Sequence, residues 1–122
     1  MKVYISKSNQ ANMDDLISLR TILKKENHEI LEFNGGAYDP GLLLKADQMM
    51  ILPPMENKIK NLDGKGEVRI GKGNYTEVSR FLEVKENNPV FMFKDGKEYL
   101  VTNINRTNED WKVDYARLIF SI

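Results

Sequence analysis

The segment MMILPP, residues 49–54, limits the fold of this chain more than any other stretch. Its first four residues are apolar without alternation, and Pro53 and Pro54 end the run. A strand with one solvated face alternates apolar and polar residues, whereas a central strand of a parallel sheet is covered on both faces and is apolar throughout. We therefore predict a buried central strand here, with helices on both sides of its sheet.

Strand and helix patterns alternate from Val3 to Phe93, which supports this prediction. The other elements expected in this region are strands at 3–5, 30–33 and 89–93, helices at 13–26 and 75–85, and a short helical stretch through 42–44 that Asp39 caps. Such alternation implies parallel strands joined by helical crossovers. We expect an α/β fold, a flavodoxin-like or Rossmann-like three-layer sandwich with a mainly parallel sheet of about five strands.

The chain after Phe93 departs from this alternation. Asp95-Gly96, between VFMF and EYLVTNI, is a strong hairpin signal and predicts an antiparallel hairpin at the edge of the sheet. The last segment, TNEDWKVDYARLIF, has two interpretations. The spacing of Trp111 and Tyr115 fits a helix, whereas alternation through Val113 fits a strand. We predict the helix and keep the strand as the alternative.

Composition excludes several classes of protein. The 122 residues suit one domain, residues 1–122, and Lys plus Arg equals Asp plus Glu at 18 each, so nothing indicates nucleic acid or an anionic membrane as a partner. Cysteine is absent and His28 is the only histidine, which argues against disulfides and a metal site. Apolar runs are far shorter than the ~20 residues that cross a bilayer. We expect a cytoplasmic protein without metal or other cofactor.

Ligands of open parallel sheets bind beyond the carboxyl ends of the strands. Three loops leave such ends here, at residues 6–10, 35–39 and 53–73, and we expect them to converge on one site. The candidate substrate-binding residues on and just beyond these loops are Ser6, Ser8, Asp39, Pro53, Gly71, Lys72, Gly73 and Asn74.

Glu77 is the main candidate for chemistry. It follows a glycine-bearing turn and lies within one turn of the predicted helix start, where backbone N–H groups favour an anion. A carboxylate there is either a nucleophile in a pocket or the partner of Asn74 in a capping box, and the local sequence leaves both open. The stretch GKGNYTE is neither a P-loop nor a dinucleotide fingerprint, so we exclude ATP hydrolysis.

Asp47 and Tyr4 are the other candidate catalytic residues. Asp47 directly precedes the central strand, where an acid hydrogen-bonds a ligand base or ribose, or simply forms a turn. Tyr4 belongs either to the core or to the floor of the site. The loop from 55 to 72, with a short ribbon near Val68, carries basic residues that suit either a phosphate or a solvated surface, because acidic residues lie among them.

Three motifs in order, MKVYIS, LLLKADQMMILPP and GKGNYTEVSRFLE, resemble the nucleoside 2-deoxyribosyltransferase-like family over roughly residues 1–93. The shared features are the K-x-Y-I-S start, an acid before the third strand, matched by Asp47, and a glycine four residues before a glutamate, matched by Gly73 and Glu77. The chain departs from the family at Lys7-Ser8, where Gly-Pro is usual, and lacks an acidic residue just ahead of the glycine turn.

The resemblance implies that Glu77 attacks the anomeric carbon of a nucleoside and forms a glycosyl-enzyme ester. It also implies that Asp47 holds or protonates the base and that Tyr4 orients Glu77. The expected ligand is a small-molecule nucleoside or nucleotide, and the expected assembly is a homo-oligomer that uses NINRTN and the terminal aromatic segment. The alternatives are a noncatalytic nucleotide-binding or sequestering protein, a TIR-like domain that cleaves NAD, and a protein-binding domain.

Overall fold

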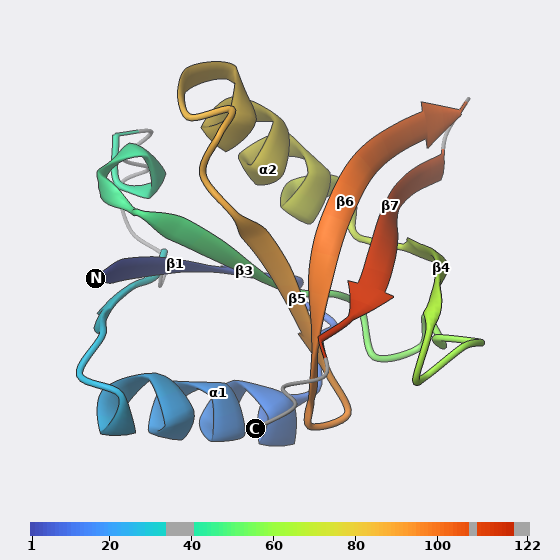
Figure 1. The fold of residues 1–122 in the computed structure, drawn as a ribbon, viewed down its shortest axis with the longest axis horizontal. Coiled ribbons are helices and arrows are strands. Elements are labelled where there is room, and N and C mark those ends of the chain that lie inside the picture. The colour runs from blue at the N-terminus through green and yellow to red at the C-terminus, as the bar shows by residue number, and fades with distance from the viewer. Residues whose placement is uncertain (34–40, 108–109, 119–122) are drawn as a thin grey trace.

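The computed structural model describes residues 1–33, 41–107 and 110–118. In this part of the chain, seven strands form one sheet in the order β2-β1-β3-β5-β6-β7-β4, and helices lie on both sides of it (Figure 1). The strands are β1 (Lys2–Lys7), β2 (Glu29–Leu31), β3 (Gln48–Leu52), β4 (Lys65–Arg69), β5 (Val90–Lys94), β6 (Lys97–Thr107) and β7 (Asp110–Arg117). The helices are α1 (Met13–Lys25), the 3₁₀ turn η1 (Leu43–Lys45) and α2 (Lys72–Val84).

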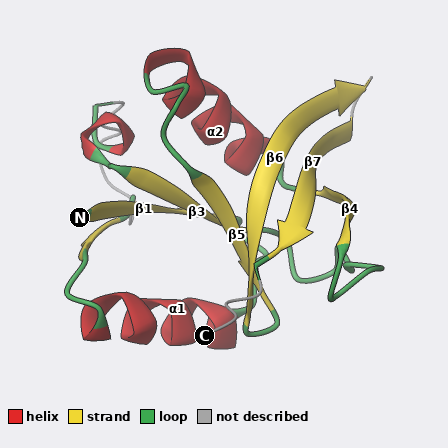
Figure 2. Ribbon diagram, viewed as in Figure 1, coloured by secondary structure: helices red, strands yellow, loops and turns green. Residues whose placement is uncertain are grey.

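The central strand predicted from MMILPP is confirmed as β3, which pairs in parallel with β1 on one side and β5 on the other. Its side chains alternate between two cores. Met50 and Leu52 pack with the leucines of α1, and Met49 and Ile51 pack with residues of α2. Figure 2 shows the two helices on opposite sides of this parallel half of the sheet. Because both faces are covered, the strand is apolar from Met49 to Leu52.

Helix α1 begins where its capping signal predicts. The side chain of Asn12 accepts a hydrogen bond of 2.8 Å from the backbone N–H of Asp14. The helix ends at Lys25, one residue short of the predicted boundary, and the chain reverses through Asn27, whose φ is 63°. The face toward the sheet buries Leu16, Leu19 and Leu23.

Helix α2 begins at Lys72, three residues earlier than predicted. Gly71 is the N-cap residue, and its backbone N–H donates to the side-chain oxygen of Asn74 at 3.0 Å. Asn74 is therefore the third residue of the helix and caps the N-terminus from there. The capping box between Asn74 and Glu77 is wrong, because Glu77 lies in the second turn, beyond the free N–H groups of the first.

The Asp95-Gly96 hairpin between β5 and β6 is confirmed. Both turn residues have positive φ, 52° and 77°, as a two-residue hairpin with the right-handed strand twist requires. The buried carboxylate of Asp15 on α1 accepts both backbone N–H groups of the turn, at 2.9 and 3.1 Å. The hairpin is thereby fixed to the helix that covers it.

The predicted helix in the last segment is wrong, because residues 110–117 form β7. This strand lies between β6 and β4, and it buries Val113 and Tyr115, the latter edge-to-face with Tyr99 at 5.2 Å. The two-residue alternation was the correct signal. With β4, the ribbon expected near Val68, the described residues form seven strands instead of about five. Within the same residues, neither helix has the length and apolarity to cross a membrane.

Candidate functional site

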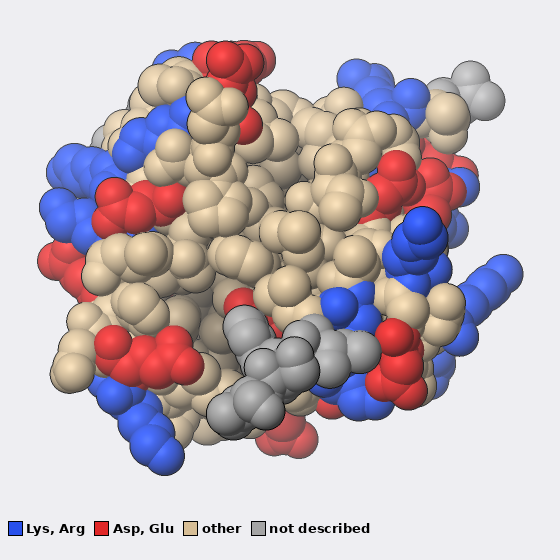
Figure 3. All heavy atoms as spheres, viewed as in Figure 1, with Lys and Arg blue, Asp and Glu red and all other residues tan. Residues whose placement is uncertain are grey.

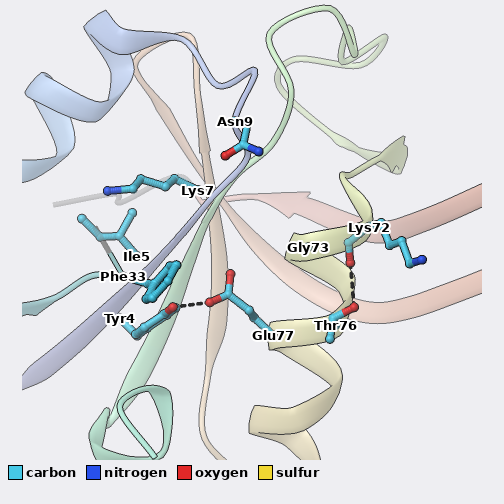
Figure 4. Close-up of a pocket in the computed structure, with 9 residues that line it drawn as sticks. All are labelled: Tyr4, Ile5, Lys7, Asn9, Phe33, Lys72, Gly73, Thr76 and Glu77. Carbon is cyan, nitrogen blue, oxygen red and sulfur yellow. Dashed lines mark hydrogen bonds between the residues drawn. The ribbon is translucent and has the colours of Figure 1, made fainter. Parts of the chain in front are cut away.

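A cavity of about 450 Å³ opens at the carboxyl end of β1, beside the first turns of α2. The residues that line it are Tyr4, Ile5, Lys7, Asn9, Phe33, Lys72, Gly73, Thr76 and Glu77. Figure 4 shows the side chains of Tyr4, from β1, and Glu77, from α2, pointing toward each other. The loop after β1 and the start of α2 thus meet as expected. Part of the loop after β2, which includes Asp39, lies outside the described residues.

The carboxylate of Glu77 faces the sheet. It accepts hydrogen bonds from the hydroxyl of Tyr4 at one oxygen and from the hydroxyl of Ser6, at 2.9 Å, at the other. Both donors are buried on β1, with exposed fractions of 3% for Tyr4 and 0% for Ser6. The next residue along the helix, Val78, is fully buried against the same face. Glu77 therefore belongs to the pocket and not to the wet surface of α2.

Burial raises the pKa of Glu77 above the ordinary glutamate range. The hydrogen bonds from Tyr4 and Ser6 and the positive charge of Lys7 act in the opposite direction but do not cancel this effect. The carboxylate consequently titrates closer to neutrality than a surface glutamate. A partly desolvated carboxylate with fixed orientation is suited to act as a nucleophile or a base.

Asn74 determines how Ser6 is oriented. Its amide nitrogen donates to the carbonyl oxygen of Ser6 at 2.9 Å and to the hydroxyl oxygen of Ser6 at 3.1 Å. Since that hydroxyl oxygen accepts from Asn74, its own hydrogen is directed to Glu77. Asn74 is itself 1% exposed and lies behind the pocket, so it supports the site and does not line it.

A cluster of three charged side chains lies next to the pocket at Lys7. The carboxylate of Glu32 accepts from Lys7 at 2.8 Å and from two nitrogens of Arg20 at 2.9 and 2.7 Å. Burial acts to raise the pKa of Glu32, but the hydrogen bonds from Arg20 and Lys7 outweigh it and hold the pKa below the ordinary range. This cluster of two cations and one anion leaves a net positive charge beside the pocket wall.

Asp47 is not brought to the site, which corrects the prediction that it contacts the base. It precedes the amino end of β3, while the pocket lies beyond the carboxyl ends of the strands, about 16 Å away at 3.3 Å per residue. Its carboxylate accepts from the backbone N–H of Lys2 at 2.7 Å, and its own N–H donates to the Lys2 carbonyl. Asp47 therefore joins the segment before β3 to the start of β1 and has a structural role.

Of the other predicted substrate-binding residues, Lys72 and Gly73 line the pocket, whereas Ser6 lies beneath Glu77. The hydroxyl of Ser8 accepts from the backbone of Gln10, and Pro53 is buried away from the cavity. Gly71 allows a close approach, since a Cβ there would lie 3.1 Å from the side-chain oxygen of Asn74. The backbone N–H of Gly71 already donates to that oxygen, so a ligand would bind this N–H group only by displacing the side chain of Asn74.

Sequence reasoning missed several lining residues. Phe33 lies two residues beyond β2, at the end of the strand predicted at 30–33, and that position was its only signal. Thr76 follows Lys72 by four residues on the helix, a spacing that becomes visible only when the helix is started at the correct residue. Asn9 lies on the loop after β1, which was expected to contribute, although this residue was not singled out.

Apart from Lys72, the basic residues of the loop predicted at 55–72 do not line the pocket. Lys58, Lys60 and Arg69 line a different surface groove together with Glu56 and Glu67, which favours the solvated, mixed-charge interpretation of this loop. On the face drawn in Figure 3, basic and acidic side chains are likewise interspersed. Among the described residues, no group of three or more histidine and acidic side chains is placed to hold a metal ion.

No family model matches the chain, and neither curated proteins nor solved structures give a significant match. The chemistry of the pocket is therefore the main guide to its function.

Proposed function

We propose that this protein cleaves the N-glycosidic bond of a nucleoside or nucleotide, by transfer or hydrolysis, with Glu77 as the nucleophile. The observation that carries the proposal is the Glu77 carboxylate in the pocket, held by Tyr4 and Ser6. The roles of Glu77 and Tyr4 agree with those implied by the resemblance to nucleoside 2-deoxyribosyltransferases. We extend the proposal to membership of that family and to a flavodoxin-like three-layer arrangement.

The reaction has two displacement steps. One carboxylate oxygen of Glu77 forms a bond to the anomeric carbon while the C–N bond breaks and the base leaves with the electron pair. Water or a second base then attacks the same carbon and releases the carboxylate. Tyr4 and Ser6 each bind a different oxygen of Glu77, so both hydrogen bonds orient the carboxylate before it attacks. Asp47 has no part, because it lies at the other end of the sheet.

The cavity suits a ligand of this size. A volume of about 450 Å³ falls within the range of small-molecule sites, and Phe33 supplies an aromatic face for a base. A Cβ on Gly73 would meet no atom within 4 Å, so the space above the first turn of α2 is open to the sugar. These features support a nucleoside-sized ligand without selecting its base.

The decisive experiment incubates the protein with a panel of nucleosides, nucleotides and NAD, and follows base release by chromatography. Release of base, with a glycosyl adduct on Glu77 detected by mass spectrometry after acid quenching, is the expected result. Tight binding without release instead supports the second candidate, a nucleotide-sequestering protein. The replacement of the family's Gly-Pro by Lys7-Ser8 favours that candidate. Absence of any binding contradicts both and leaves the protein-binding domain.

Replacing Tyr4 by phenylalanine is expected to lower the rate of base release about tenfold or more and to change its pH dependence. The hydrogen bond from Tyr4 lowers the pKa of Glu77, so its removal raises that pKa further. The acidic limb of the rate profile, which reports ionisation of Glu77, should therefore move to higher pH. Rate measurements across the acidic and neutral range test this, and an unmoved limb contradicts the assigned role of Tyr4.

We retain the proposal of a homo-oligomer, with its interface changed by the structure. Tyr115, expected at the interface, is buried in the core, and Ile119 and Phe120 lie outside the described residues. Of the stretch NINRTN, residues 103–107 lie on β6, where Asn103 and Arg106 are exposed, and Asn108 lies outside the described residues. Light scattering of the purified protein measures the oligomeric state, and a mass equal to one chain at all concentrations contradicts the proposal. The cytoplasmic location stays a prediction.

A further inference from the structure

A second groove lies beside α2, separated from the Glu77 pocket by Lys72 and Thr76. It has a volume of about 360 Å³ and separates the helix from the tip of the β6–β7 ribbon. Lys72 and Thr76 line both this groove and the Glu77 pocket, so the two cavities share a wall. Figure 4 shows the side chain of Lys72 extending away from Glu77. A ligand bound in the pocket would thus extend past Lys72 into the groove.

On the ribbon side of the groove, the residue pairs change from apolar to cationic and aromatic toward the tip of the ribbon. Arg106 on β6 and Trp111 on β7 are directly opposed in the ladder, and the next pair on the same face is Ile104 with Val113. Val113 is fully buried and Ile104 packs against the core. Residues two apart on a strand share a face, so Arg106 and Trp111 continue the face that covers α2. Core packing alone does not require a cation there.

The helix side supplies two more cations. Lys72, Thr76 and Arg80 are spaced by four residues and therefore form one stripe along α2. Arg80 forms an exposed ion pair with Glu83, at 3.6 Å, and such pairs contribute little. Of the charged side chains that line the groove, three are cationic and one is anionic, which leaves a net charge of +2 (3 − 1). The whole chain, by contrast, has a net charge of zero.

The groove is held at a defined width. The backbone N–H of Ile70, one residue before the N-cap of α2, donates to the carbonyl of Trp111 at 2.9 Å. Asp110, beside Trp111, pairs with Arg69 at 2.8 Å and does not line the groove. The cations are thus presented by two backbone segments that are fixed to each other.

From this arrangement we infer that the groove binds the phosphate groups of the ligand whose sugar lies at Glu77, so that the preferred ligand is a nucleotide with two or more phosphates. The inference rests on the proposed function for the position of the sugar. Arginine forks bind phosphate oxygens in pairs, and Lys72 on the shared wall meets the phosphate nearest the sugar. Trp111 lies against the phosphate chain and reports its presence.

Trp111 is the only tryptophan, so its fluorescence reports on the groove directly. We expect inorganic pyrophosphate to change the emission of the full chain. By calorimetry at low salt, a nucleoside 5′-triphosphate should bind at least about tenfold more tightly than the nucleoside, and added salt should reduce the difference. Arg106→Gln and Arg80→Gln should each lose at least about fivefold of this advantage with unchanged affinity for the nucleoside. Lys60→Gln removes one charge from the loop outside the groove and should behave as wild type.

The outcomes separate the groove from the reaction. Equal affinity for triphosphate and nucleoside, with an unchanged Trp111 emission, overturns the groove even if base release is observed. An advantage that persists in both arginine variants places the phosphates elsewhere and overturns it as well. Pyrophosphate and triphosphate binding that depends on Arg106, without release of any base, supports the groove while the glycosidic reaction fails. Both arginines are exposed, so the variants should fold.

Discussion

Glu77→Gln is expected to reduce base release by at least about 10³-fold. Glutamine keeps the shape of the side chain and still accepts hydrogen bonds from Tyr4 or Ser6, but its amide is not a nucleophile toward the anomeric carbon. Affinity for the ligand should change little, because the variant alters a group that bonds to carbon only in the reaction. Single-turnover assays and calorimetry on the same protein separate the two effects.

The same substitution should stabilise the protein at neutral pH, because it removes a carboxylate whose charged form is disfavoured by burial. The pKa of Glu77 is raised, so the folded state keeps a proton over a pH range in which the unfolded chain has released it. Wild-type stability therefore falls as the pH rises through this range. Glutamine does not titrate, and the gain should be small near about pH 4 and full above the raised pKa. Urea unfolding at several pH values measures it.

A matched control is Glu86→Gln, two residues beyond α2, because its side chain is exposed and lines neither the pocket nor the groove. Neither base release nor the pH dependence of stability should change in this variant. If Glu77→Gln releases base at the wild-type rate, the nucleophile is another group and the proposed mechanism is wrong.

The parallel half of the fold was predictable because its signals are local. An unbroken apolar run gave β3, the Asn12 cap gave the start of α1, and Asp95-Gly96 gave the hairpin. Each of these patterns depends only on a few neighbouring residues and on the backbone conformation that they favour. Their order along the chain was then enough to place the carboxyl ends of β1 and β3 at one edge, where the pocket lies.

The antiparallel half depends on contacts that no local window contains. In β7, Val113 pairs with Ile104 on one side and with Val68 on the other, and the second partner lies far back in the chain. The last segment carried both a helical and a strand pattern, and the pairing of β7 with β6 and β4 selected the strand. The start of α2 was predicted three residues too late for a similar reason. Asn74 looked like the N-cap residue, but it is the third residue of the helix, where its side chain contacts the distant Ser6.

The candidate site was predictable in part. The position of Glu77 before a helical apolar face marked it as a carboxylate that enters the core or caps a turn, and its partners Tyr4 and Ser6 are more than seventy residues away. The prediction for Asp47 was wrong because a residue before a strand and a residue after it lie at opposite ends of the sheet. Arg106 and Trp111 become a pair only through the ribbon.

Asn74→Ala is expected to destabilise the protein by about 3 kcal/mol and to lower its melting temperature by roughly 10 °C. The side chain is buried and joins three backbone segments through the carbonyl of Ser6, the N–H of Gly71 and the carbonyl of Leu52, at 2.9, 3.0 and 3.5 Å. Alanine removes the partner of the Gly71 N–H and one hydrogen bond to the Ser6 carbonyl, while the Leu52 carbonyl still accepts from the N–H of Ser8 at 3.0 Å. The lost bonds lie in a buried site, so the desolvation of these backbone groups is no longer fully offset. Thermal and urea unfolding followed by circular dichroism measure the loss.

Asn74→Asp distinguishes the two functions of the amide. Aspartate still accepts from Gly71 but has no donor for Ser6, and its charge faces the Ser6 carbonyl, so it should be about as damaging as alanine at neutral pH and less so in acid, where protonation restores a donor. Asn87→Ala, at an exposed position, should stay within about 0.5 kcal/mol of wild type. A stable Asn74→Ala protein with normal base release would show that Ser6 holds its orientation unaided, and the account of how the pocket positions Glu77 would then have to rest on Tyr4 alone.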